Sequence, residues 1–116
     1  MRDWNRLRER YLRDETPTRL GNIASNMARI RSFCRNMANR DAAIGIFQEN
    51  KYFLEWAGTD TNTDIETVTE LLELQRQLTR WQTHWAEIWD NPEEKQKVAD
   101  RSQFWADRIL QLSGLL

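Results

Sequence analysis

The chain has one histidine and one cysteine, the residue types most often used for metal binding and nucleophilic catalysis. Glu87 follows His84 by three residues, so on a helix the carboxylate could orient the imidazole or share a metal ion with it. Two ligands do not complete a zinc site. Carboxylate-bridged di-metal bundles need a Glu-x-x-His motif on each of two helices, which one histidine cannot supply. The sequence therefore excludes a di-metal site of that kind.

Other chemical signals are equally sparse. Cys34 lies between Ile30 and Met37 on an apolar seam, which indicates a buried, inert thiol. His84 lies off the apolar stripe of its helix, so we expect it to face solvent. The sequence has no phosphate-binding glycine loop and no dinucleotide-binding turn. We therefore predict a protein that is not an enzyme, with no catalytic residue, no metal ligand and no cofactor.

Arginines in the first forty residues form the most regular charged pattern. They could make a basic face that contacts phosphates. The row on the first segment and the pair further on are Arg2, Arg6, Arg10, Arg13, Arg31 and Arg35, with Arg29 nearby. The isoelectric point of about 5.9 and the acids Glu9, Asp14 and Glu15 argue against nucleic-acid binding, which remains the alternative function.

Charge is divided unevenly along the chain. Residues 1–40 carry ten arginines and four acids, a net charge of +6, and residues 41–116 carry seven bases and fourteen acids, a net charge of −7. The two halves could neutralise each other across the fold. The other interpretation is a basic face left open for an acidic partner.

Three tryptophans spaced by four residues lie in the segment RWQTHWAEIWD, residues 80–90. Trp81 and Trp85 continue a heptad stripe of Leu71, Leu74 and Leu78, so we expect them in the core. A small apolar ligand held by tryptophans is a minor third hypothesis. Its pocket would be lined by Trp81, Trp85 and Trp105.

The same helix has a second stripe that is apolar at both ends and polar in the middle. Its members are Ile65, Val68, Leu72, Gln75, Thr79, Gln82, Ala86 and Trp89. A bundle covers one face of a helix, so this second face needs the N-terminal segment or another molecule. Surplus aromatic residues of this kind are typical of protein contacts. The candidate interface residues are Trp4, Leu7, Tyr11, Trp89 and Phe104.

Stop signals and apolar periodicity divide the chain into helices that could position these residues. We predict an all-α, antiparallel up-and-down four-helix bundle with a short additional N-terminal helix, in one domain spanning 1–116. The expected helices cover residues 3–14, 17–39, 42–57, 64–90 and 92–113. A phase change near residues 39–41 favours two helices there, with Asp41 as the second N-cap. One long kinked helix over 17–57 is the alternative.

Composition sets the remaining expectations. The longest apolar run, residues 42–47, is far shorter than the roughly twenty residues of a membrane span, so we expect no membrane partner. The N-terminus has no apolar signal-peptide region, and one cysteine makes no internal disulfide, which favours the cytoplasm. We predict a non-enzymatic protein-interaction or assembly module that binds a second copy, as a homodimer, or another protein.

Overall fold

The structure, a computed structural model, describes residues 3–35, 40–58 and 64–114. Within these ranges the chain forms six helices and no strand, which confirms the all-α prediction. The helices are α1 (Trp4–Arg13), α2 (Thr16–Cys34), α3 (Arg40–Gly58), α4 (Ile65–Thr83), α5 (Trp85–Trp89) and α6 (Pro92–Ser113).

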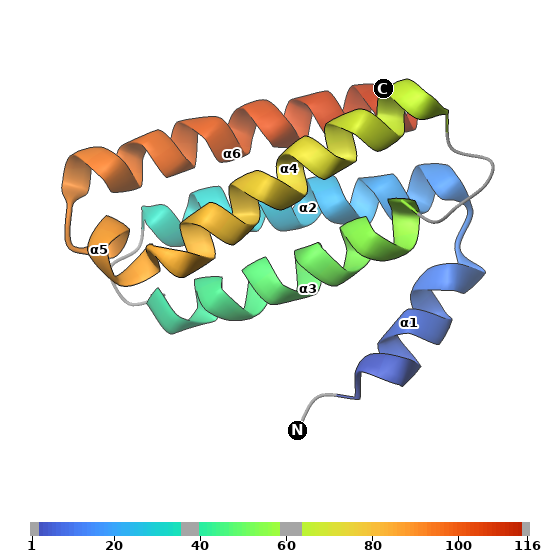
Figure 1. Ribbon diagram of the computed structural model, residues 1–116, viewed down its shortest axis with the longest axis horizontal. Helices are drawn as coiled ribbons and strands as arrows, with labels where there is room; N and C mark the ends of the chain where they lie inside the picture. The colour runs from blue at the N-terminus through green and yellow to red at the C-terminus, as the bar shows by residue number, and fades with distance from the viewer. Residues whose placement is uncertain (1–2, 36–39, 59–63, 115–116) are drawn as a thin grey trace.

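Four long helices lie lengthwise beside one another (Figure 1). They are α2, α3, α4 and α6, and each runs opposite to the long helix before it. α2 packs chiefly on α6 and α3, and α4 packs chiefly on α3. α1 lies at an angle beside the C-terminal end of α3. The molecule measures 40 × 32 × 21 Å, so α6, about 33 Å long at 1.5 Å per residue, spans most of its length.

Capping side chains explain where several helices begin and end. Asp3 accepts a hydrogen bond from the backbone N–H of Arg6, and Asn91 accepts from those of Glu93 and Glu94. These bonds satisfy N–H groups that have no partner inside a helix. Gly114 ends α6 with φ of 75°, a left-handed conformation that glycine adopts without steric cost.

The helix expected over residues 17–39 ends at Cys34, with Arg35 as its C-cap, and residues 36–39 lie outside the described ranges. α3 begins at Arg40, so the prediction of Asp41 as the N-cap is wrong, because Asp41 already lies in the first turn. α2 and α3 pack against each other in opposite directions, so they are two helices and not one kinked helix.

The helix expected over residues 64–90 is interrupted at His84, which has φ of −106° and ψ of 16°. α4 ends at Thr83, and the five residues of α5 follow before the chain turns into α6. Asp64 is the N-cap of α4 and accepts a 2.8 Å hydrogen bond from the backbone N–H of Thr67. That bond lowers the pKa of the Asp64 carboxyl.

The core is built from the heptad stripes of the long helices. α2 contributes Ile23, Met27 and Ile30, all fully buried, and α4 contributes Leu71, Leu74 and Leu78. Phe47, Trp85 and Ile109 are further large side chains that are almost completely buried.

One polar pair lies inside this apolar interior. Asn50 of α3 is fully buried, and Asn26 of α2 is 4% exposed. Asn26 Nδ2 donates to Asn50 Oδ1 at 3.2 Å, and Asn50 Nδ2 lies 3.4 Å from the carbonyl oxygen of Ile23 and 3.2 Å from Sδ of Met27. The hydrogen bonds offset the cost of removing both amides from water.

Replacing Asn26 with leucine is expected to lower the free energy of unfolding by about 1–3 kcal/mol, because Asn50 Oδ1 then loses its donor while still buried. Urea unfolding followed by circular dichroism measures the change. The double variant Asn26→Leu/Asn50→Leu is the control, since removing both partners is expected to restore most of the loss. A double variant less stable than the single variant would contradict this account.

Candidate functional site

The central tryptophans of the 80–90 segment are core residues, as the sequence predicts. Trp81 is 6% exposed and Trp85 is 2% exposed. Trp85 packs edge-on against Phe47, with ring centroids 4.8 Å apart, and its Nε1 donates to the carbonyl oxygen of Arg40 at 3.0 Å. Trp89 is half-buried against Trp85 at 5.6 Å, and Lys95 Nζ lies 4.3 Å from its ring centroid. This cluster therefore fills the interior.

Trp4, Leu7 and Tyr11, which the sequence assigns to a contact with another molecule, lie on the side of α1 that faces its own chain. Tyr11 is 2% exposed and stacks on Phe53 with ring centroids 4.4 Å apart. Trp4 lies 4.6 Å from Tyr52 of α3. Tyr11 has almost no surface left for a partner, and its contacts fix α1 against α3.

Docking of α1 on α3 leaves the second stripe of α4 without cover from the N-terminal segment. Ile65 is 83% exposed and Leu72 is 51% exposed. The other side of the stripe is half-buried, at Val68, Gln75, Gln82 and Trp89, and Gln82 accepts a hydrogen bond from Lys51 of α3. Ile65 and Leu72, two turns apart, are the most exposed large apolar side chains among the described residues.

Phe104 of α6, the remaining candidate interface residue, is 48% exposed, with the Arg101 guanidinium 4.4 Å from its ring centroid. Nearby, Arg108 Nε donates to Glu70 Oε1 at 2.7 Å and joins α6 to α4. Phe104 lies one helical turn before Arg108 on α6. Among the described residues, three of the five exposed large apolar side chains therefore belong to α4 and α6.

A groove of about 590 Å³ separates α4 from the first turns of α6. Trp81, Ile88 and Val98 supply its apolar side chains. In the groove, His84 Nδ1 lies 3.4 Å from Glu87 Oε2, and Lys97 Nζ lies 3.1 Å from Glu94 Oε1. The His84 side chain is 55% exposed, which confirms that it faces solvent.

The arginines of the first forty residues do not form one continuous stripe. Arg2 lies outside the described residues, and Arg6 is exposed near the start of α1. Arg31 and Arg35 lie at the C-terminal end of α2. At a rise of 1.5 Å per residue, they are roughly 20 Å from the first turn of that helix. Arg10 and Arg13 instead border a hollow between α1, α2 and α3.

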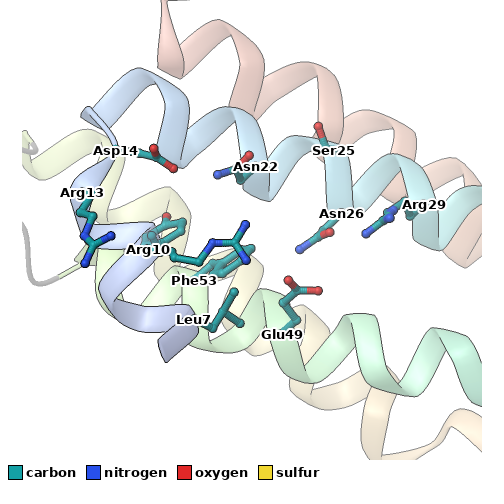
Figure 2. A pocket seen from close by; sticks show the side chains of 11 residues that line it. Leu7, Arg10, Arg13, Asp14, Asn22, Ser25, Asn26, Arg29, Glu49 and Phe53 are labelled. Atoms are coloured by element: carbon teal, nitrogen blue, oxygen red, sulfur yellow. The ribbon is translucent and has the colours of Figure 1, made fainter. Parts of the chain in front are cut away.

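This hollow has a volume of about 480 Å³ and is drawn in Figure 2. Arg10 reaches from α1 over Phe53 toward the gap between α2 and α3. Asn26 of α2 and Glu49 of α3 border this gap, and Arg29 lies further along α2. Arg13 points away from that gap. The full lining consists of Leu7, Arg10, Tyr11, Arg13, Asp14, Asn22, Ser25, Asn26, Arg29, Glu49 and Phe53.

The floor of the hollow is polar and well packed. Glu49 is 8% exposed and Asn26 is 4% exposed. Tyr11, beside them, donates from its hydroxyl to the carbonyl oxygen of Arg19 at 3.2 Å. Buried polar side chains beside two guanidinium groups are suited to hydrogen bonding and charge recognition, not to holding a purely apolar molecule.

Cys34 is buried, as the sequence predicts, and burial raises the pKa of its thiol to about 11. The thiol is therefore protonated and unreactive at neutral pH. Among the described residues no three His, Cys, Asp or Glu side chains are grouped so that they could hold a metal ion. No described helix is long and apolar enough to cross a membrane.

Sequence reasoning singled out Arg10, Arg13 and Arg29 but missed Asn26, Glu49 and Phe53 as their neighbours in the hollow. Asn50 interrupts the apolar seam of residues 43–57. That interruption was a signal for a buried polar pair, but the sequence does not show which residue of α2 completes it.

Comparison with known proteins adds no further constraint: no protein-family model, no curated protein and no solved structure matches the chain.

Proposed function

We propose that the protein is a non-enzymatic interaction module of the cytoplasm whose four long helices form one antiparallel up-and-down bundle that pairs with a second copy. The observation that carries the proposal is the exposed side of the second α4 stripe, where Ile65 and Leu72 face outward because α1 docks on α3 instead. Exposed apolar side chains on one helix face are typical of protein contacts. The single buried cysteine supports a reducing compartment.

Charge order along α4 favours a second copy as the partner. Glu66 and Glu73 are exposed in its first half, and Arg76 and Arg80 are exposed in its second half. Within one chain Glu73 Oε1 and Arg76 Nη1 already form an exposed 3.2 Å ion pair, which a partner's charges would have to join or replace. A two-fold axis across α4 would pair the helices antiparallel, so the acidic half of one copy would face the basic half of the other. Leu72 would lie near the axis. Such complementarity fixes orientation, while burial of the apolar side chains supplies most of the affinity.

Replacing Leu72 with glutamate is expected to convert the dimer to a monomer, because a carboxylate would be buried at the pairing face. Light scattering across a protein concentration series, at low and high salt, measures the molar mass. Ile44→Glu is the matched control, since Ile44 is 38% exposed and lies on α3, not on α4. A wild-type chain that is monomeric at every concentration would refute the proposal.

Charge-reversal variants of α4 test whether the partner is a second copy of the same chain. The variants Glu66→Arg/Glu73→Arg and Arg76→Glu/Arg80→Glu carry a uniformly basic and a uniformly acidic α4 face. Each alone is expected to be monomeric, and an equimolar mixture is expected to form a heterodimer. All four side chains are exposed, so the fold should tolerate the changes. A mixture that stays monomeric would contradict antiparallel pairing through α4.

A further inference from the structure

We propose that the hollow between α1, α2 and α3 is a binding site for a small organic oxyanion, a molecule that carries a phosphate or carboxylate on a compact apolar body. The inference is independent of self-association, because the hollow is lined by α1, α2 and α3 and the pairing face lies on α4. It rests on the charges, the polar floor and the size of the hollow.

The charges come from two different helices. Arg10 of α1 and Arg29 of α2 both border the hollow, and neither forms an ion pair within the described part of the chain. Two guanidinium groups beside the same space repel each other, and a bound oxyanion would replace that repulsion with attraction. The planar fork of arginine also matches the oxygen geometry of phosphate and carboxylate.

The floor and one wall supply the remaining contacts. Asn26 borders the space with an amide that keeps a second N–H beyond its bond to Asn50. Ser25 adds a hydroxyl group from the neighbouring position on α2. On the opposite side, Phe53 and Leu7 give an apolar surface against which the body of a ligand can pack (Figure 2).

Size and net charge define the class of ligand. The volume of about 480 Å³ lies within the range of small-molecule sites, roughly 300–1,000 Å³. Of the charged side chains along the gap between α2 and α3, Arg10 and Arg29 contribute +2 and Glu49 contributes −1, so their formal charge is +1. This balance suits one anionic group. It does not suit a polyphosphate or a nucleic-acid backbone, which would meet the buried Glu49 carboxylate.

Isothermal titration of the full chain at constant ionic strength tests the proposal, with phenyl phosphate and phenylacetate as probes. Benzyl alcohol is the neutral comparator. At least one anion is expected to bind saturably at one site per chain, and the stronger of the two identifies the preferred oxyanion. The neutral alcohol is expected to bind at least tenfold more weakly.

Arg10→Gln and Arg29→Gln are each expected to weaken binding of that anion about tenfold, since each removes a charge-assisted hydrogen-bonding group. Arg8→Gln is the matched control, because Arg8 is exposed on the same helix and does not border the hollow. Circular dichroism verifies that the variants keep their helix content. Absence of binding by both anions, or equal weakening in all three variants, would overturn the proposal.

Discussion

Replacing Trp85 with alanine is expected to lower the free energy of unfolding by about 3–5 kcal/mol, the usual cost of removing a buried aromatic side chain. Trp85 is 2% exposed, packs edge-on against Phe47 and donates its indole N–H to the carbonyl oxygen of Arg40. Alanine would leave a cavity and remove the hydrogen bond that the indole donates. The loss is a large share of the roughly 5–15 kcal/mol that stabilises a domain.

Trp89→Ala is the comparison for this variant. Trp89 is half-buried, with Lys95 over its ring. Its removal would therefore leave a depression that water can fill, not an enclosed cavity. We expect its effect to be less than half that of Trp85→Ala. Urea unfolding should be followed by far-ultraviolet circular dichroism, since tryptophan fluorescence changes with the substitution itself. Equal losses in the two variants would contradict the assignment of Trp85 to the core.

Replacing Tyr11 with alanine is expected to detach α1 from the rest of the molecule. Tyr11 stacks on Phe53 at 4.4 Å, lies 5.6 Å from Trp56 and donates to the carbonyl oxygen of Arg19. Isolated helices shorter than about 12–15 residues are marginal in water, so the ten residues of α1 should unfold once undocked. The expected cost is about 3–5 kcal/mol, as for other buried aromatic residues.

Hydrogen exchange resolved by mass spectrometry would show the detachment as loss of protection over residues 4–13. The conservative variant Tyr11→Phe keeps the stacking and removes only the hydroxyl group. It is expected to cost about 1 kcal/mol and to leave α1 protected. If Tyr11→Ala left the protection of α1 unchanged, the docking of α1 through Tyr11 would be wrong.

Local signals in the sequence were sufficient for much of the fold. Asn91-Pro92 and Gly114 mark the ends of α6, because an N-cap, an N-terminal proline and a left-handed glycine each act through neighbouring backbone groups. The heptad stripe that joins Trp81 and Trp85 to the leucines of α4 likewise identified core residues, since residues three and four apart share a helix face.

The interruption at His84 could not be predicted in the same way. No proline or glycine marks that position, and the apolar stripe continues through Trp85 and Ile88. Trp85, the residue after the break, donates a hydrogen bond to the carbonyl oxygen of Arg40, forty-five residues away in the chain, and a local pattern cannot reveal such a tertiary contact.

The hollow between α1, α2 and α3 could not be predicted from the sequence either. A helical wheel grouped Arg10 with Arg13, which point in different directions (Figure 2), and could not pair Arg10 with Arg29 on another helix. The sequence also left open whether the apolar side of the N-terminal segment covers its own chain or contacts another molecule. The structure shows that it packs on α3.

The buried amide pair between α2 and α3 has a consequence for how the chain selects one alignment. Apolar seams of similar side chains can pack in more than one register, because a helix shifted by a turn still buries apolar surface. A shift of α3 by one turn would carry Asn50 past Asn26 and break the hydrogen bond between these two buried amides. The buried amide pair therefore raises the free energy of alignments in which α2 and α3 are shifted by a turn, and it favours the observed register.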